Sequence, residues 1–417
     1  HWMVHSFPTR RSSDLPALVL ALATTLALPQ SGAAADGRHP ECGDTRTIAG
    51  ASDVVRTLAA GVQLRTWSSK VADVAIVSAE PGSSRIRTWT APAGTVQLPS
   101  TTLALDTDAL AAVNGDFFFH DGLGWNPASD VVVGGQAKYV VPGWTPSLAI
   151  DGRGGLRATE VRVTGTVRFA WVAKVKRSVI TIVNGHRVRK TVVVRVNGRR
   201  DVALSGMNSV GSVSDATAVL FTRTWPKTLS APARVRMLRT AGTSTPAARV
   251  APIATNPTPT RPWLLLGPDA ARRLAGVPAS AIATVTWSAV AKDGTAVRDS
   301  IGRGALLMRD GNVVANCAGE DRPRTAVGWD DDGHVWIMTA QGGTAAAATH
   351  GARFGGTTNF QMARWLHALG ATDAVSLDGG GSTDLEVRTA AGVHRADLPD
   401  GTFARRVSNA LMLVPRG

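Results

Sequence analysis

The chain has few cysteines, a single tyrosine and little charge, and each shortage narrows what it can be. Of its 417 residues, two are cysteine, one is tyrosine, 5% are aromatic and 18% are charged. Two cysteines are too few for a structural zinc site. The phenylalanines lie mainly in core-like runs, so the aromatic platform that stacks on nucleic-acid bases is missing. We therefore expect no nucleic-acid partner.

The histidines are isolated, and no repeat of fixed period is present. None has the sequence spacing that builds a metal site, so each is interpreted as a surface or packing residue. The sequence does not identify metal ligands. We expect that no cofactor is required, with a divalent cation (calcium or magnesium) as the alternative. These histidines are His334, His350, His367 and His394.

What is present describes an ordinary soluble globule with an excess of basic residues. Hydrophobic residues make up 44% of the chain, the formal charge is +14 and the pI is near 11. Such a charge favours anionic partners such as phosphorylated glycans or cell-wall polymers. The alternative is that arginine scattered in an Ala- and Gly-rich chain reflects genomic base composition.

The first 35 residues are interpreted as a sequence artefact followed by an export signal. Residues 5–15 resemble a translated sequencing adapter, and 16–28 form an apolar segment too short to span a bilayer with ease. Small residues at 31–35 suit signal-peptidase cleavage near Ala35. The expected location is secreted or cell-wall associated, with no stable membrane insertion after cleavage. In that location Cys42 and Cys317 are expected to form a disulfide.

The remaining chain predicts an α+β fold, with a strand-rich mixed sheet core and few helices in one large domain. Apolar alternation broken by Gly turns recurs along the chain, including turns at 184–185 and 197–198. One helix is predicted to start at Asp106 or Asp108 and run through Ala112, and a clearer one spans 357–370. We divide the chain into a β-rich region (36–105) and a catalytic domain (106–417), with a basic hairpin at 174–200 and a Pro/Thr-rich loop at 240–262.

The stretch 373–385 is the most informative in the chain. A short apolar strand ends on Asp378, and Gly379, Gly380 and Gly381 follow before Ser382 and Thr383. Three glycines are costly to order, but they let successive N–H groups approach a ligand, as suits phosphate or sugar oxygens. No Lys follows the last glycine as a nucleotide-phosphate loop requires, and no Gly lies two residues after the Ser as an esterase requires. A plain turn is the alternative.

Two other segments attract attention. Asn114-Gly115-Asp116 precedes a cluster of three phenylalanines, although an Asn-Gly hairpin turn is the more common meaning of that pattern. Arg324 begins a strand beside a stiffening proline, which suits bidentate capture of a phosphate, with a surface ion pair as the alternative. The run 330–332 is three aspartates, which we interpret as a hairpin turn rather than a calcium loop because the distal carboxylate is missing.

These segments together resemble the phosphodiester glycosidase family. The matching pieces are Asn-Gly-Asp-Phe-Phe at 114–118, the segment 322–328, Leu-Asp-Gly-Gly-Gly-Ser-Thr at 377–383 and Arg-Val-Ser-Asn-Ala at 406–410. The resemblance covers roughly 106–414. It implies a hydrolase that cleaves the glycosidic bond of a sugar-1-phosphodiester, giving a free sugar and a phosphomonoester. A phosphorylated glycan is the expected substrate.

The resemblance and the residue chemistry give one set of candidate site residues. Asp378 is expected to act as a general acid or base, or to contact sugar hydroxyls. Asp116 or Glu320 would be the second carboxylate that glycosidases use. The catalytic candidates are Asp378, Asp116 and Arg324, and the substrate-binding candidates are Asn114, Gly115, Thr325, Gly379, Gly380, Gly381, Ser382, Thr383 and Asn409.

The chain departs from the family pattern at two positions. Gln341 stands where an Asp is expected, and Asp116 stands where many relatives carry a second Gly. Two other functions stay open. One is a metal-dependent phosphodiesterase that breaks a P–O bond with Asp116 and Asp378 as metal ligands. The other is a non-catalytic wall protein that holds anionic glycan on its basic surface.

Overall fold

The protein is built mostly from β-strands. Strands account for 60% and helices for 9% of the computed structural model, so the α+β expectation overstated the helical part. Among the described residues, no helix combines the length and the apolar composition needed to cross a bilayer. The structure describes residues 54–68, 72–92, 94–120, 125–184, 186–208, 216–221, 236–239, 250–252, 263–278, 281–317, 319–342, 356–398 and 404–416. The predicted export signal and Cys42 lie outside these ranges, so the signal and the disulfide stay predictions.

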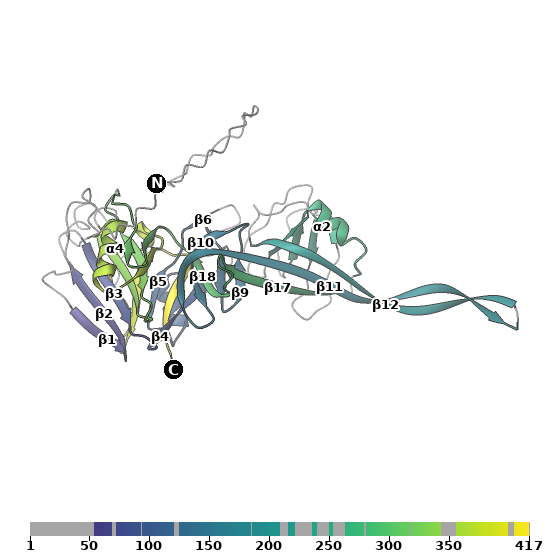
Figure 1. Cartoon of the computed structure of the whole chain (residues 1–417), viewed down its shortest axis with the longest axis horizontal. Helices are drawn as coiled ribbons and strands as arrows, with labels where there is room; N and C mark the ends of the chain where they lie inside the picture. The colour runs from purple at the N-terminus through teal and green to yellow at the C-terminus, as the bar shows by residue number, and fades with distance from the viewer. Residues whose placement is uncertain are drawn as a thin grey trace, which may run out of the picture. The chain divides into compact units, whose positions relative to one another are not determined.

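One eight-stranded sheet contains the strand that leads into Gly379, Gly380 and Gly381, here called the glycine loop (Figure 1). Its central strands, Val335–Gly342, Arg324–Trp329 and Asp373–Ser376, are buried along nearly their whole length, so side chains on both of their faces are covered. The order across the sheet is β1 (Val54–Ala59), β2 (Val62–Ser68), β3 (Ala72–Ala79), β22 (Val335–Gly342), β21 (Arg324–Trp329), β23 (Asp373–Ser376), β19 (Leu306–Arg309) and β20 (Asn312–Val313).

A five-stranded sheet packs against one face of that sheet. Ile337 and Val375 from the larger sheet share a core with Val113, Leu385 and Leu411 from the smaller one. Burial of such side chains is the main driving force that holds the two sheets together. The order is β25 (Gly392–Arg395), β24 (Leu385–Thr389), β5 (Ala111–Asn114), β26 (Asn409–Pro415) and β4 (Ser84–Thr90).

Helices cover the two outer faces. Helix α4 (Asn359–Ala368) packs Met362 and Leu366 against the far face of the eight-stranded sheet. Helix α1 (Pro99–Leu105) buries Leu103 against the outer face of the five-stranded sheet. The four layers are therefore α4, the large sheet, the small sheet and α1.

The N-terminal strands are woven into both sheets. β3 pairs along its whole length with β22, and β4 pairs with β26. Residues 54–90 therefore complete two sheets whose other strands, except β5, come from the C-terminal part of the chain.

An eleven-stranded sheet contains the long hairpin and a separate core with helix α2 (Pro268–Arg273). Its order is β15 (Val250–Pro252), β14 (Arg236–Arg239), β16 (Trp263–Leu266), β13 (Ala218–Phe221), β12 (His186–Met207), β11 (Leu156–Val183), β10 (Thr145–Asp151), β18 (Val297–Gly302), β8 (Val131–Val133) and β9 (Gln136–Tyr139), with β17 (Ile282–Ala291) paired to β11. A two-stranded pair, β6 (Phe118–His120) and β7 (Trp125–Pro127), completes the described strands.

Local predictions met different outcomes. The helix predicted over 357–370 is confirmed, with the Thr358 hydroxyl accepting from the Gln361 N–H at 3.1 Å and Gly370 at φ +105° after its end. The helix predicted through Ala112 is wrong, because α1 ends at Leu105 and the following residues enter β5. The 240–262 loop lies largely outside the described residues.

The turn predicted at Asn197-Gly198 is also wrong, because both residues lie within β12. A Cβ on Gly198 would lie 2.1 Å from the Trp171 ring on the neighbouring strand. The glycine makes room for a cross-strand aromatic and does not turn the chain.

Candidate active site

Ends of strands from both packed sheets converge at one place. β5 ends at Asn114, β23 leads into Asp378, β21 begins at Arg324 and β26 begins at Asn409. Antiparallel pairing aligns these ends, with Ala326 opposite Ser376 and Ala410 opposite Asn114. The segments singled out in the sequence are therefore brought together by the registers of two sheets.

Asn114 joins these strand ends through its buried side chain. Its Nδ2 donates to the Asp378 carbonyl at 2.7 Å, and its Oδ1 accepts from the Thr325 hydroxyl at 2.7 Å and from the Asp384 N–H at 3.2 Å. The adjacent Gly115 carbonyl accepts from the Asp378 N–H at 2.9 Å. An amide that both donates and accepts here fixes the start of the glycine loop. The Asn-Gly hairpin is therefore ruled out, and Asn114 and Thr325 support the site from within.

Close backbone contacts explain two of the loop glycines. The Gly380 N–H donates to the Pro323 carbonyl at 2.8 Å, and a Cβ on Gly379 would lie 2.8 Å from that same oxygen. Gly380 also has φ +61°, which side chains rarely adopt. The loop is thus seated on the residue before Arg324, and its turn continues through Ser382 as a short 3₁₀ helix (Gly380–Ser382).

Asp378 is the half-buried carboxyl of this loop. Burial raises its pKa to about 6, although hydrogen bonds from the Ser382 hydroxyl and the Gly379 N–H, and the charge of Arg405, each act to lower it. The Gly379 N–H donates to its Oδ1 at 2.9 Å. A carboxyl with such a pKa can exchange protons near neutral pH, which is the property expected of a general acid or base.

Asp116 lies nearby but is almost fully buried. Burial raises its pKa to about 7, hydrogen bonds from Ser129 and Phe117 act against the rise, and the negative charge of Asp378 adds to it. Its own N–H donates to Asn409 Oδ1 at 2.7 Å. Because only 2% of Asp116 is exposed, Asp378 is the carboxyl of the two that can contact a substrate. The charge of Asp378 therefore acts on Asp116, and the sequence analysis named both residues as catalytic candidates.

Glu320 has a different environment. Its carboxylate is exposed and paired with Arg322, while its carbonyl accepts from Arg324 at 3.2 Å. Of the two candidates for the second carboxylate, Asp116 is therefore the one placed beside Asp378.

Two arginines flank the glycine loop. Arg324 lies near its start, with its Cδ 3.8 Å from where a Cβ on Gly379 would be, and Arg405 lies near its end, with Nη1 3.5 Å from the Ser382 hydroxyl. Among the described residues, neither guanidinium forms an ion pair with a carboxylate. Burial, and the nearby charge of Arg322, lower the pKa of Arg324. Unpaired guanidiniums on both sides suit an anionic ligand.

Sequence reasoning missed Arg405. It stacks its guanidinium over the Phe118 ring at 5.1 Å, an arrangement that fixes a long side chain beside the loop. The only sequence signal was its position directly before the 406–410 segment that resembles the family.

Gln341 belongs to a buried polar network under the loop. Its Nε2 donates to the Thr383 carbonyl at 2.7 Å and to Asp397 Oδ2 at 2.8 Å. Arg395 reaches the same Thr383 carbonyl at 3.1 Å and pairs with Asp397 at 2.8 Å and Asp384 at 3.3 Å. An aspartate at 341 could not donate to either acceptor when ionised. The departure from the family pattern at this position therefore supplies two donors that hold the loop.

Two of the candidate substrate-binding residues have a buried side-chain polar group with no hydrogen-bond partner among the described residues. They are the Thr383 hydroxyl and the Asn409 Nδ2 group. Buried polar atoms without a partner are uncommon, and they cluster where a ligand or ordered water completes the bonding. Both residues belong to the sequence-predicted site.

Gly302 at the end of β18 leaves the space that the Asp116 carboxyl fills. A Cβ there would lie 2.0 Å from Asp116 Oδ2. We expect Gly302→Ala to lower the free energy of unfolding by about 2 kcal/mol or more, as overpacking of a rigid site does. Denaturant titration measures this. Gly152→Ala is the matched control, because nothing lies within 4 Å of that Cβ; equal stabilities of the two variants would contradict the packing.

Buried carboxyls also predict the pH dependence of stability. The pKa values of Asp116 and Asp130 are raised from 3.8 to about 7 and that of Asp378 to about 6, in each case mainly by burial. The folded state thus binds protons at these carboxyls more tightly than the unfolded state does. The stabilisation that each carboxyl contributes is complete below pH 3.8 and is lost as pH rises through 6 to 7, at about 1.4 kcal/mol per pH unit for each group.

The thermal midpoint is therefore expected to fall between pH 5 and pH 8, measured by scanning calorimetry in buffers of matched ionic strength. Asp130→Asn keeps an acceptor for the Val141 N–H, which now donates to Asp130 at 2.7 Å, and should flatten the slope. A midpoint that rises over this range would show that the carboxyls are not held in this way.

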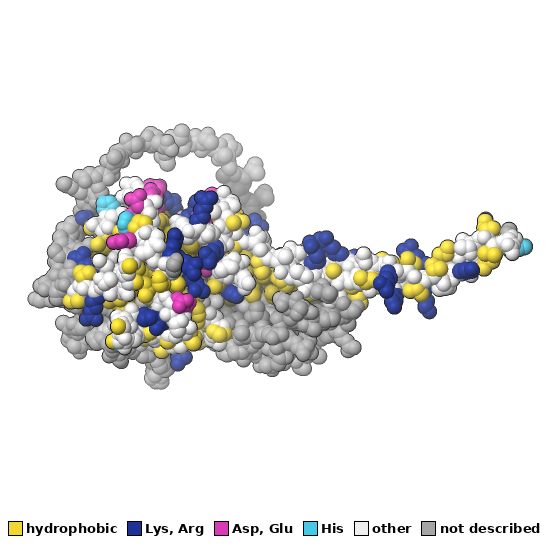
Figure 2. All heavy atoms as spheres, turned by 90° about the horizontal axis from the view of Figure 1, so that it is seen from below, with side chains coloured by type: hydrophobic (Ala, Val, Ile, Leu, Met, Phe, Trp, Pro, Cys, Tyr) yellow, Lys and Arg dark blue, Asp and Glu magenta, His cyan; other side chains and the backbone are white. Residues whose placement is uncertain are grey.

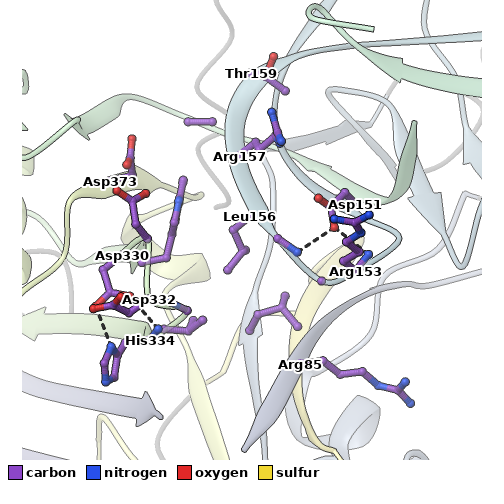
Figure 3. Close-up of a pocket in the computed structure, with 18 of the residues that line it drawn as sticks. Arg85, Asp151, Arg153, Leu156, Arg157, Thr159, Asp330, Asp332, His334 and Asp373 are labelled. Atoms are coloured by element: carbon purple, nitrogen blue, oxygen red, sulfur yellow. Dashed lines mark hydrogen bonds and ion pairs between the residues drawn. The ribbon is translucent and has the colours of Figure 1, made fainter. Parts of the chain in front are cut away.

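An open hollow lies at the opposite end of the central strands. The β21–β22 turn confirms the hairpin predicted at 330–332, and the Asp330 carboxylate accepts from the Gly333 and His334 N–H groups and meets His334 Nδ1 at 2.7 Å. Donor atoms of Asp330, Asp332 and His334 lie within 4.8 Å of one another, so they could hold a cation. The hollow, of about 980 Å³, has an acidic side and a basic side (Figure 3), formed by Asp330, Asp332, Asp373 and by Arg85, Arg153, Arg157.

This hollow is not where the sequence-predicted site residues lie. Asp373 begins β23 at the hollow, and Asp378 follows the other end of the same strand. The hollow lacks a buried carboxyl with an unpaired guanidinium beside it. We therefore place the candidate active site at the glycine loop.

Comparison with known proteins agrees with the family predicted from the sequence. Residues 265–414 match the family model described as phosphodiester glycosidase, which covers β21, the glycine loop and β26. This confirms the resemblance for that part of the chain. A search of curated proteins gave no match.

Solved structures share the fold at low sequence identity. A hypothetical protein from Synechocystis is 18% identical with a TM-score of 0.56, over 88% of this chain and 64% of that one. A Burkholderia pseudomallei protein, named as a candidate exported protein, is 20% identical with a TM-score of 0.53, over 85% and 74%. This chain thus spans less than two thirds of the Synechocystis protein.

The catalytic domain of zebrafish N-acetylglucosamine-1-phosphodiester alpha-N-acetylglucosaminidase is 12% identical, over 88% of this chain and 81% of that one. Its TM-score of 0.35 is too low to compare the two folds.

Proposed function

We propose that this protein, whose residues 265–414 match the phosphodiester glycosidase family, hydrolyses the glycosidic bond of a sugar-1-phosphodiester. The observation that carries the proposal is the glycine loop, where Arg324 lies beside Gly379 and the charge of Arg405 acts on the Asp378 carboxyl. Neither arginine pairs with a described carboxylate, so both are free to bind a phosphodiester, and Asp378 would then face the adjoining sugar. The proposed site is outside the cell, in line with the predicted export signal.

The chemistry divides between the arginines and Asp378. The bond between the anomeric carbon and the bridging oxygen breaks, and its electron pair stays on the phosphate as a phosphomonoester. Charge therefore grows on the phosphate in the transition state, where Arg324 and Arg405 would stabilise it. The phosphate leaves as an anion, so the leaving oxygen needs little help from an acid.

Asp378 would then act as the base. Water adds its hydroxyl to the anomeric carbon and gives its proton to the Asp378 carboxylate, which is mainly ionised above pH 6. Asp116 does not touch substrate in this scheme. Its partial negative charge near neutral pH makes Asp378 a stronger base, because the two carboxyls repel.

Product analysis tests the proposal. Incubation with a panel of sugar-1-phosphodiesters should release free sugar together with a phosphomonoester. Release of a sugar phosphate would show cleavage of the other ester bond and would reject the proposal.

Removal of metal is expected to leave turnover unchanged. In the metal-dependent alternative Asp116 would have to be a metal ligand. However, it is buried, and its pKa of about 7 leaves it protonated in about half of the molecules at pH 7. Its Oδ1 also already accepts from the Phe117 N–H at 2.7 Å. Dialysis against a chelator, followed by the product assay at pH 7, measures this. Loss of activity that returns with calcium or magnesium would favour the metal-dependent phosphodiesterase.

A further inference from the structure

The distal part of the β11–β12 hairpin is a two-stranded ribbon, here called the basic ribbon (171–183 and 186–198). β17 pairs with β11 only as far as Ala170, and β13 joins β12 only from Leu204. Between these points each of the two strands pairs with no other described strand, from Trp171 opposite Gly198 to Val183 opposite His186. Figure 1 shows β11 and β12 as a long ribbon, and both faces of it are open to solvent.

One face of the basic ribbon is apolar. Residues directly opposite each other in an antiparallel pair share a face, so the register places the ribbon's valines together. Val175 lies opposite Val194, and Arg177 and Lys190 are the two cations on this face. The apolar residues of this face are Trp171, Ala173, Val175, Val179, Val183, Val188, Val192, Val194 and Val196.

The other face is basic, and near the tip it is also apolar. Ile180 and Ile182 are 57% and 73% exposed there. No aspartate or glutamate occurs between Glu160 and Asp201, and none of the ribbon's cations forms an ion pair with a described acid. Lysine, arginine and hydrophobic side chains alternate along the ribbon in Figure 2. The cations of the basic face are Lys174, Lys176, Arg187, Arg189 and Arg195.

We propose that the basic ribbon binds the interface of an anionic lipid bilayer. Exposed isoleucine and valine gain free energy by leaving water, and lysine and arginine gain by contact with headgroup phosphates. Long basic side chains reach the headgroup level even from the face opposite the apolar one. The ribbon's outer edges carry unpaired N–H and C=O groups, so it lies at the interface and does not span the hydrocarbon.

Two other occupants fit less well. A second copy of the chain would bring the same set of cations against the first, and like charges repel. A soluble anionic polymer would neutralise the cations but leave the valine face in water. The bilayer is the partner that matches both the charge and the apolar area.

Sedimentation with lipid vesicles tests the proposal on the full chain. Wild-type protein should bind phosphatidylcholine vesicles that contain about 30% phosphatidylglycerol, but not phosphatidylcholine alone, and about 0.5 M NaCl should weaken the binding. Val175→Ser with Val179→Ser and Val194→Ser removes apolar area but no charge. Lys174→Gln with Lys176→Gln and Arg195→Gln removes three charges. Each triple variant should bind the anionic vesicles at least about 10-fold more weakly.

A charge-matched control removes three arginines outside the ribbon, Arg85→Gln with Arg153→Gln and Arg416→Gln, and should bind like wild type. Thermal midpoints close to wild type confirm folding, because the ribbon contributes no residue beyond its base to a core. Unchanged binding by the valine variant, or an equal loss in the control, would overturn the bilayer proposal in favour of a soluble polyanion or of general charge attraction. A ribbon-dependent dimer in gel filtration would likewise overturn it.

Discussion

Asp378→Asn should lower kcat/KM for a sugar-1-phosphodiester by about 10³-fold or more, because the base that accepts the proton of water is lost. The fold should persist. The asparagine oxygen can still accept from the Gly379 N–H, which now donates to Asp378 Oδ1 at 2.9 Å. The substitution also removes a carboxyl whose pKa is raised to about 6 by burial, so no buried charge is left without a partner. Steady-state kinetics at pH 7 and a thermal melt measure the two effects.

Asp373→Asn is the matched control for that variant. Asp373 begins the strand that Asp378 follows, and burial also raises its pKa, yet it faces the hollow at the other end of the sheet. We expect near-wild-type turnover. If Asp378→Asn keeps wild-type activity, or both variants lose it equally, the assignment of the base to Asp378 is wrong.

Arg324→Ala is the second change with a large expected effect. Charge-assisted hydrogen bonds to a phosphate are stronger than neutral ones, so kcat/KM should fall by about 10²-fold. Among the described residues, the Arg324 guanidinium donates to the carbonyls of Thr357 and Glu320, which leaves other donors for the substrate. An aryl glycoside without phosphate provides a second substrate, on which the variant and wild type should have equal rates.

Arg322→Ala is the control for Arg324. It lies two residues away in the same segment, but it is exposed and pairs with Glu320. Its loss should change kcat/KM by less than about 2-fold, because exposed ion pairs contribute little. Equal losses from the two arginines would indicate general electrostatic attraction and not a specific phosphate contact.

The sequence singled out the segments that converge in the candidate site, whereas it overstated the helical part of the fold. Asn114 and Asp378 stood out as polar residues beside glycine, and the structure joins them directly, because Asn114 Nδ2 donates to the Asp378 carbonyl. Thr325 and Asn409 came from the family resemblance; Thr325 donates to Asn114 Oδ1, and Asn409 Oδ1 accepts from the Asp116 N–H. A polar side chain beside glycine at the end of a strand is a local signal that a sequence can carry.

What the sequence could not predict depends on contacts between distant strands. The eight-stranded sheet joins β3 to β22 across more than half of the chain, and no local pattern encodes that pairing. Arg405 is held beside the loop by contacts with Phe118 and Ser382, which belong to other segments of the chain. Gly198 was predicted to be in a turn, because the sequence does not show that the Trp171 ring of the neighbouring strand needs the space beside it.

Hydrolysis in water labelled with oxygen-18 tests the central claim most directly. Attack on phosphorus at the sugar side would give the same two products as attack on the anomeric carbon, so product identity alone cannot separate them. Cleavage of the glycosidic bond predicts a phosphomonoester that contains no label, with the label in the sugar at early times. Label in the phosphomonoester would show that water attacks phosphorus, and would contradict the proposed function.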